Sequence, residues 1–63
     1  MCLSTVYQKE ATKDNLLCSD VAAIDCDEGV VTLTDLFGRK VRYEGSILHA
    51  DLTGGVVILT PLA

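Results

Sequence analysis

Turn-forming residues divide this chain into segments of the length that β-strands usually have. Tight-turn signals occur at residues 27–29 (DEG), 38–39 (GR) and 53–55 (TGG), and glycine supplies the positive φ that such turns need. The runs between them are rich in β-branched residues, which favour strands. Helical periodicity is weak throughout, and the polar residues 8–16 lack an apolar stripe. The sequence therefore predicts an all-β fold.

The turn signals also place the strands. Residues 8–16 are predicted to form a loop, and residues 16–26 one bent strand or two short ones. An antiparallel meander or barrel of five to seven short strands fits this pattern, and residues 1–63 are expected to form a single β domain. The expected β segments are 2–7, 16–26, 30–37, 40–45, 46–52 and 56–60.

The small size of the chain favours a partner subunit. A chain of 63 residues buries only about 60% of the surface that its unfolded form exposes. Its hydrophobic content is nevertheless 49%, and its mean hydropathy is +0.37. A monomer of this size cannot cover that much apolar surface, so we expect a symmetric homodimer.

Charge and composition narrow the functional classes. Nine acidic against five basic residues give a net charge of −4, which argues against a nucleic-acid partner, since phosphate binding needs a concentrated basic surface. No apolar run approaches the roughly 18 residues needed to span a bilayer, and we find no secretory signal. We therefore expect a cytoplasmic protein with no membrane partner, whose three cysteines are thiols.

Cys2 is the first candidate functional residue. If Met1 is removed, Cys2 carries a free α-amine as well as a thiol, and the two can close a five-membered chelate ring on a metal ion. The amine has a pKa near 7.7–8.0, so it can lose its proton to a metal close to neutral pH. Planar nitrogen and sulfur donors suit Ni(II) or Cu(II), and a tetrahedral arrangement suits Zn(II). The alternative is a small buried side chain at a strand start.

The other candidates are weaker. Strand alternation places Cys26 on the face opposite Asp25 and Asp27, so we expect a solvated acidic hairpin with one inward thiol. Cys18 is expected in the core. His49, the only histidine, would share a face with Asp51, and it is either a second ligand or a surface residue.

An enzymatic function finds little support in the residues. A cysteine nucleophile needs a base, and only one histidine is present. The sequence contains no Gly-rich phosphate loop before a helix, no HExxH and no CxxC.

Several short motifs of the chain occur in the same order as in a known protein family. The start M-C-x-x-x-V-Y (Met1, Cys2, Val6, Tyr7) and the segments DVAAID, VTLTDLFG and EGSILHADL resemble the CooT family of small nickel-binding proteins. The resemblance covers most of the chain and ends around Leu59.

The resemblance implies a specific function. It implies an all-β homodimer that binds Ni(II) through Cys2 of both chains, as a metallochaperone-like accessory protein for a nickel enzyme such as carbon monoxide dehydrogenase. Of the candidate residues, only Cys2 lies in the family's metal motif. The alternative function is a small β-barrel module that binds RNA or a protein and has no role in metal binding.

Overall fold

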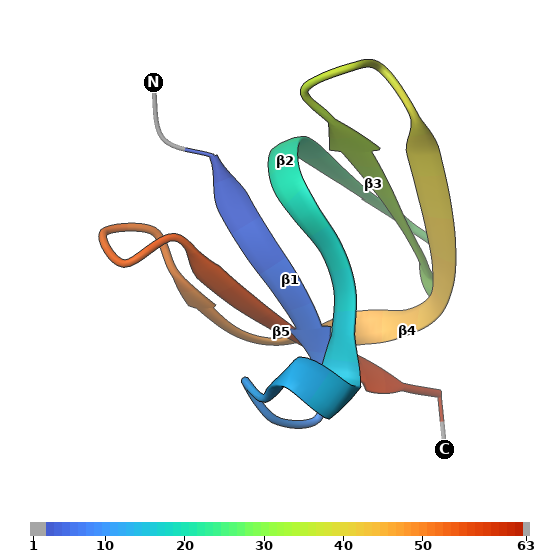
Figure 1. The fold of residues 1–63 in the computed structure, drawn as a ribbon. Coiled ribbons are helices and arrows are strands. Elements are labelled where there is room, and N and C mark those ends of the chain that lie inside the picture. Colours follow the sequence, from blue (N-terminus) through green and yellow to red (C-terminus); the bar gives the residue numbers. More distant parts are fainter. Residues whose placement is uncertain (1–2, 63) are drawn as a thin grey trace.

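Five strands and one short 3-10 helix make up the chain in the computed structural model, which describes residues 3–62 (Figure 1). The helix η1 lies in the segment predicted to be a loop. The elements are β1 (Ser4–Gln8), η1 (Lys13–Asn15), β2 (Leu16–Asp27), β3 (Val30–Asp35), β4 (Lys40–Asp51) and β5 (Val56–Pro61).

The strands close into a barrel in the order β1-β2-β3-β4-β5, as the sequence predicted. Four neighbouring pairs are antiparallel, but β1 and β5 pair in parallel, with Thr5 opposite Val56 and Gln8 opposite Leu59. Among residues 3–62, this seam is the one parallel pair in the otherwise antiparallel barrel that the sequence predicted. Five strands that reverse direction at each connection leave the first and the last pointing the same way, so closing the ring makes that pair parallel.

Two strands are long and bent: β2 is the single bent strand that was one of the two alternatives for residues 16–26, whereas β4 replaces two predicted short strands. The first half of β2 pairs with β1 and its second half with β3. In the same way β4 pairs first with β3 and then with β5, so the segments 40–45 and 46–52 form one strand. Figure 1 shows both strands curving around the barrel. The bend in β2 lies near Asp20, whose φ is +54°, a conformation that aspartate tolerates better than most residues.

The bend in β4 is at Gly45, which is buried. Its N–H donates to the carbonyl oxygen of Gly29 at 2.8 Å, and it lies opposite Pro61 on β5. A Cβ added at this position would lie 2.1 Å from the carbonyl oxygen of Thr60 and 2.7 Å from Cε2 of Tyr43. Only glycine therefore allows β5 to approach β4 this closely.

The core is small and mostly aliphatic. Alternate residues of β3 and β5 point inward, as period-two strands require. The side chains of Leu17, Cys18, Ile24 and Tyr43 pack around the buried set. Tyr43 also links β4 to β1, because its hydroxyl donates to Oε1 of Gln8 at 3.1 Å. The fully enclosed apolar residues are Val6, Val21, Val31, Leu33, Val57 and Leu59.

Candidate functional site

The start of β1 lies beside the β4–β5 hairpin at one end of the barrel. The N–H of Thr5 donates to the carbonyl oxygen of Gly55 at 2.8 Å. The hairpin itself is held by Asp51, whose Oδ1 accepts the N–H of Gly54 at 2.9 Å. The N-terminal segment therefore enters the barrel at a defined edge.

An open groove of about 280 Å³ lies at this end of the barrel, beside the start of β1. Leu52 is 73% exposed although it borders the groove. Ile47 and Leu48 of β4 are also exposed, but Ile47 lies opposite Leu59, which pairs with Gln8 at the other end of β1. The end where β1 starts thus combines a shallow apolar hollow with one exposed leucine. The groove is lined by Ser4, Val21, Ala22, Ala23, Ile24, Leu52 and Val57.

The three cysteines have different positions relative to the structure. Cys2 lies outside the described residues. Cys18 packs against the core, partly buried, which agrees with its predicted place. Cys26 lies on the face of β2 opposite Asp25 and Asp27, beside Val31, as alternation predicted. It is exposed, although its partner Val31 is buried in the core, so the expectation of an inward thiol was wrong. Cys18 and Cys26 are free thiols, as expected.

His49 is an exposed residue of β4. The register between β4 and β5 shifts between Ile47 and His49, so that Ile47 faces Leu59 and His49 faces Ile58. A bulge at Leu48 therefore breaks the alternation between Ile47 and His49, whereas His49 and Asp51 share a face, as predicted. Within residues 3–62, no group of three or more His, Cys, Asp or Glu side chains is arranged to hold a metal ion.

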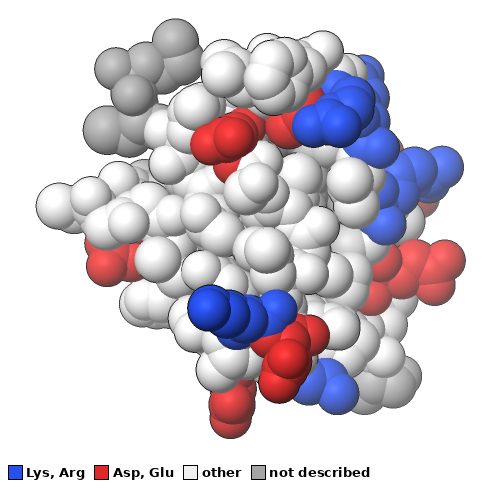
Figure 2. Space-filling view, in the orientation of Figure 1, with Lys and Arg blue, Asp and Glu red and all other residues white. Residues whose placement is uncertain are grey.

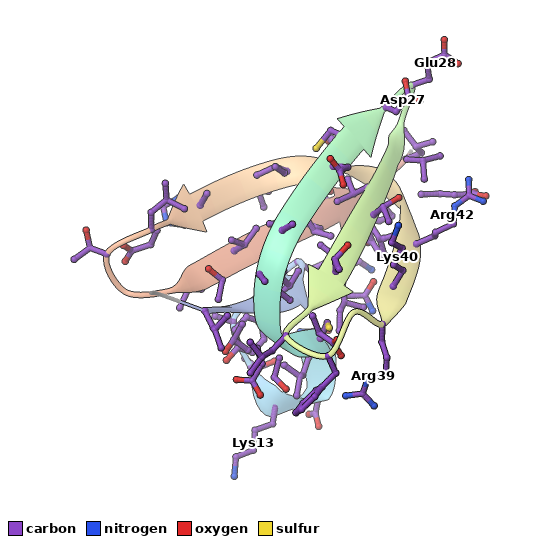
Figure 3. The ribbon with its side chains drawn as sticks, turned by 90° about the horizontal axis from the view of Figure 1, so that it is seen from above. Lys13, Asp27, Glu28, Arg39, Lys40 and Arg42 are labelled. Carbon is purple, nitrogen blue, oxygen red and sulfur yellow. The ribbon has the colours of Figure 1, made fainter. Side chains whose placement is uncertain are left out.

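The acidic hairpin carries a second open hollow, of about 290 Å³. Asp25, Asp27 and Glu28 border it on one side and Arg42 of β4 on the other. Asp25 of β2 pairs with Thr32 of β3, and Thr32 pairs with Arg42 of β4. Strand β3 therefore separates the guanidinium group of Arg42 from the carboxylates. Figure 3 shows Asp27 and Glu28 at the tip of this hairpin, in a solvated position. Glu28 and Gly29 both have positive φ, +47° and +82°, which is the geometry of a type I′ turn.

The connection between β3 and β4 is organised by Asp35, which is 6% exposed. One carboxylate oxygen accepts the N–H groups of Phe37 and Arg39, each at 2.9 Å. The other accepts Nε of Arg39 at 2.8 Å. The strand predicted for residues 30–37 therefore ends at Asp35, and Leu36 and Phe37 belong to the turn.

Comparison with known proteins decides the family. The family model for the CO dehydrogenase accessory protein CooT matches residues 1–60. The chain belongs to the CooT family. A crystal structure of a protein assigned as CooT from Carboxydothermus hydrogenoformans has the same fold, with a TM-score of 0.84 and 18% sequence identity, over 98% of this chain and 100% of that one. No curated protein matches the chain significantly in sequence.

As a CooT family member, the chain is an accessory protein and not an enzyme, as the sequence predicted. The all-β fold predicted from strand and turn signals is confirmed as well. No helix among residues 3–62 has the length and hydropathy to cross a membrane.

The role of Asp35 in this CooT chain was missed by sequence reasoning. The T-D-L-F-G segment was used only as a turn signal and as a family motif. An aspartate directly before a turn often accepts backbone N–H groups of the residues that follow, and that signal could have identified the residue. Asp35 is buried because the barrel closes around it. Local sequence does not specify that closure.

The hydrogen bonds to Asp35 predict an acid-dependent loss of stability. Burial alone would raise its pKa, but the bonds from Arg39 and Phe37 and the charge of Arg39 outweigh burial and hold the pKa of this carboxyl below its ordinary value. In the unfolded chain an aspartate titrates near 3.9. The stabilisation is therefore present above about pH 4 and is lost as the pH falls through the folded-state pKa.

Asp35→Asn should lower the melting temperature at pH 7 and have a smaller effect near pH 3. Thermal unfolding of both proteins across that pH range measures the difference between them. A deficit in the variant that is independent of pH would contradict the assigned role of the carboxylate charge. Asp25→Asn, at an exposed aspartate, is the matched control.

Proposed function

We propose that the chain forms a homodimer that binds Ni(II) through Cys2 of both subunits and passes the ion to a nickel enzyme, carbon monoxide dehydrogenase being the client. The observation that carries this proposal is the CooT family match, which runs from residue 1 to residue 60 and includes Cys2. The family's description as a CO dehydrogenase accessory protein supports the choice of client.

The donor chemistry of Cys2 fits nickel. A thiolate and the α-amine exposed by removal of Met1 form one chelate, and two chains supply two nitrogens and two sulfurs. Soft sulfur together with nitrogen donors in a plane suits Ni(II). Two bidentate sites that are weak alone act as one strong site when the dimer holds them together, because the second chelate binds at a high effective concentration. The dimer is therefore part of the proposed site.

Leu52 and the apolar groove at the β1 end of the barrel support the dimer. Leu52 is 73% exposed beside this groove, and an exposed apolar surface is typical of a contact with a partner. Leu52 borders the same groove as Ser4, the first residue of β1. A two-fold contact through this end would cover this surface close to where the N-terminal segment joins the barrel.

The remaining features of the proposal follow from this role. The whole chain, residues 1–63, acts as one metal-binding β domain, and it works in the cytoplasm. A net charge of −4 favours cations over nucleic acids as ligands. Protons compete with the metal for amine and thiolate, so affinity should fall as the pH falls.

Titration of the purified protein with Ni(II) tests the proposal. Thiolate-to-metal charge-transfer absorption should rise linearly and saturate at one Ni(II) ion per two chains. Native mass spectrometry of the same sample should show Met1 removed and a dimer that carries the metal. The absence of any nickel-dependent absorption would refute the metal site.

A charged residue at position 52 should disrupt the proposed dimer. Leu52→Asp places a carboxylate on the apolar surface, and losing one central interface side chain costs about 2 kcal/mol or more, roughly 30-fold in dissociation constant. Sedimentation equilibrium measures the monomer–dimer balance. Leu62→Asp, at an exposed leucine outside the groove, is the matched control. Dimerisation of Leu52→Asp equal to that of the native protein would place the interface elsewhere.

A further inference from the structure

The β3–β4 connection presents apolar side chains to solvent and begins at Asp35, which pairs with Val21 of the groove. Phe37 is 74% exposed and Leu36 51%. Phe37 is the only phenylalanine of the chain, and the fold leaves it out of the core. A single exposed apolar residue is ordinary on a protein surface, but two adjacent ones at a tight turn form a projecting apolar tip.

The hydrogen bonds of Asp35 hold this tip in one conformation. Besides the carboxylate bonds to Phe37 and Arg39, the N–H of Asp35 donates to the carbonyl oxygen of Arg39 at 2.9 Å, and Gly38 donates to that of Asp35 at 3.1 Å. Leu36 donates to the carbonyl oxygen of Asp20 on β2 at 2.9 Å. A tip that is already ordered loses little conformational entropy when it binds, so its exposed side chains are suited to binding.

Positive charge gathers around the tip. Arg39 and Lys40 directly follow the turn, and Arg42 lies further along β4, where it borders the acidic hollow. Cζ of Arg39 lies 5.5 Å from the centroid of the Phe37 ring, within cation–π range. Figure 2 shows the largest group of basic side chains over the β3–β4 hairpin, at the upper right. Figure 3 shows Arg39 at the opposite end of this hairpin from the acidic residues Asp27 and Glu28.

Two acidic residues near the tip offset part of this charge. The carboxylate of Asp35 is buried and paired with Arg39. Asp20 is exposed on β2, where its carbonyl oxygen meets the turn. The side chain of Arg39 is 76% exposed despite its ion pair, so its remaining donors face outward. In a chain with a net charge of −4, Arg39 and Lys40 are thus exposed cations beside an exposed aromatic residue.

We propose that the tip, defined as Leu36, Phe37, Arg39 and Lys40, is the docking site for an acidic protein surface that has an apolar pocket for Phe37. Aromatic residues and arginine are the side chains that most often dominate protein interfaces. The surrounding cations select an acidic partner by charge complementarity. The inference rests on the proposed function for the identity of that partner, which is the client CO dehydrogenase.

Binding of the native protein to purified CO dehydrogenase from the same organism tests the inference. Interferometry should show Phe37→Ser binding about 30-fold more weakly, the typical cost of removing a central interface side chain. Lys40→Gln should mainly slow association and reduce its dependence on salt. Leu62→Ser removes an exposed leucine near Gly29, at the other end of β3, and should bind normally.

Each alternative outcome is decisive. Equal binding by Phe37→Ser, or no binding by the native protein, would overturn the docking site and leave the nickel titration of the same samples as an independent result. If the Phe37→Ser variant were a monomer while the native protein is a dimer, the tip would be a self-association surface, which would overturn the docking site. Single-stranded RNA binding that is lost in Phe37→Ser would overturn it in favour of a nucleic-acid surface. Circular dichroism and thermal unfolding establish that the variant is folded.

Discussion

Replacing Cys2 with alanine is expected to abolish stoichiometric Ni(II) binding while leaving the barrel folded. Alanine is as acceptable to methionine aminopeptidase as cysteine, so the α-amine is retained and only the thiolate is lost. Without it each chain can no longer close its chelate ring, and the benefit of holding two chelates together disappears. That benefit typically corresponds to about 10²–10⁴-fold in affinity, so binding should weaken by at least about 100-fold.

Competition titration with a chromophoric chelator measures this change, and the charge-transfer band should vanish in parallel. Cys26→Ala is the matched control, because Cys26 is an exposed free thiol and its loss should leave binding unchanged. A Cys2→Ala protein that still bound one Ni(II) per dimer would exclude Cys2 as the ligand. Extra residues ahead of Met1 should block the amine and weaken binding even with Cys2 present.

Gly45→Ala is expected to be among the most destabilising single substitutions in this chain. The added methyl group would overlap the backbone carbonyl of Thr60, and backbone cannot rotate away as a flexible side chain can. Relief requires β4 and β5 to separate where β4 bends, which strains several strand hydrogen bonds. We expect a loss of about 3–5 kcal/mol, a large share of the roughly 5–15 kcal/mol typical of a small domain.

Thermal and urea unfolding should show this loss as a fall of at least about 12 °C in melting temperature. Gly38→Ala is an informative control, because Gly38 has a φ of +84° but open space around it. Its cost should be only the roughly 1–2 kcal/mol of a left-handed conformation. Equal stability of Gly45→Ala and the native protein would show that β4 and β5 are less closely packed than the structure indicates.

The sequence was a good guide to the local features of the fold. Turn signals at residues 27–29 and 53–55 match the ends of β2 and β4, because glycine and its neighbours act through their own backbone angles. Alternation correctly separated Cys26 from Asp25 and Asp27, since the period of a strand is local. Alternation also placed His49 and Asp51 on one face, but it gave no sign of the bulge between Ile47 and His49, which pairing with β5 sets.

The candidate metal site was also identified from local chemistry. Cys2 stands out because two donors on one residue are evident from the sequence itself, and its assignment as a ligand stays a prediction. The charged and apolar residues near positions 36–40 gave no comparable signal. Their significance depends on Asp35 being buried between two strands and on Phe37 being left outside the core.

By itself the sequence determined that this chain forms β-strands, where most of them begin and end, and which residue could bind a soft metal ion. These properties depend on backbone preferences and on atoms within one or a few neighbouring residues. Only the tertiary structure decided that β1 and β5 close the barrel in parallel, that β4 is continuous through Gly45, and that Asp35 fixes an exposed tip. Each of these depends on contacts between distant segments, whose distances and registers no local pattern specifies.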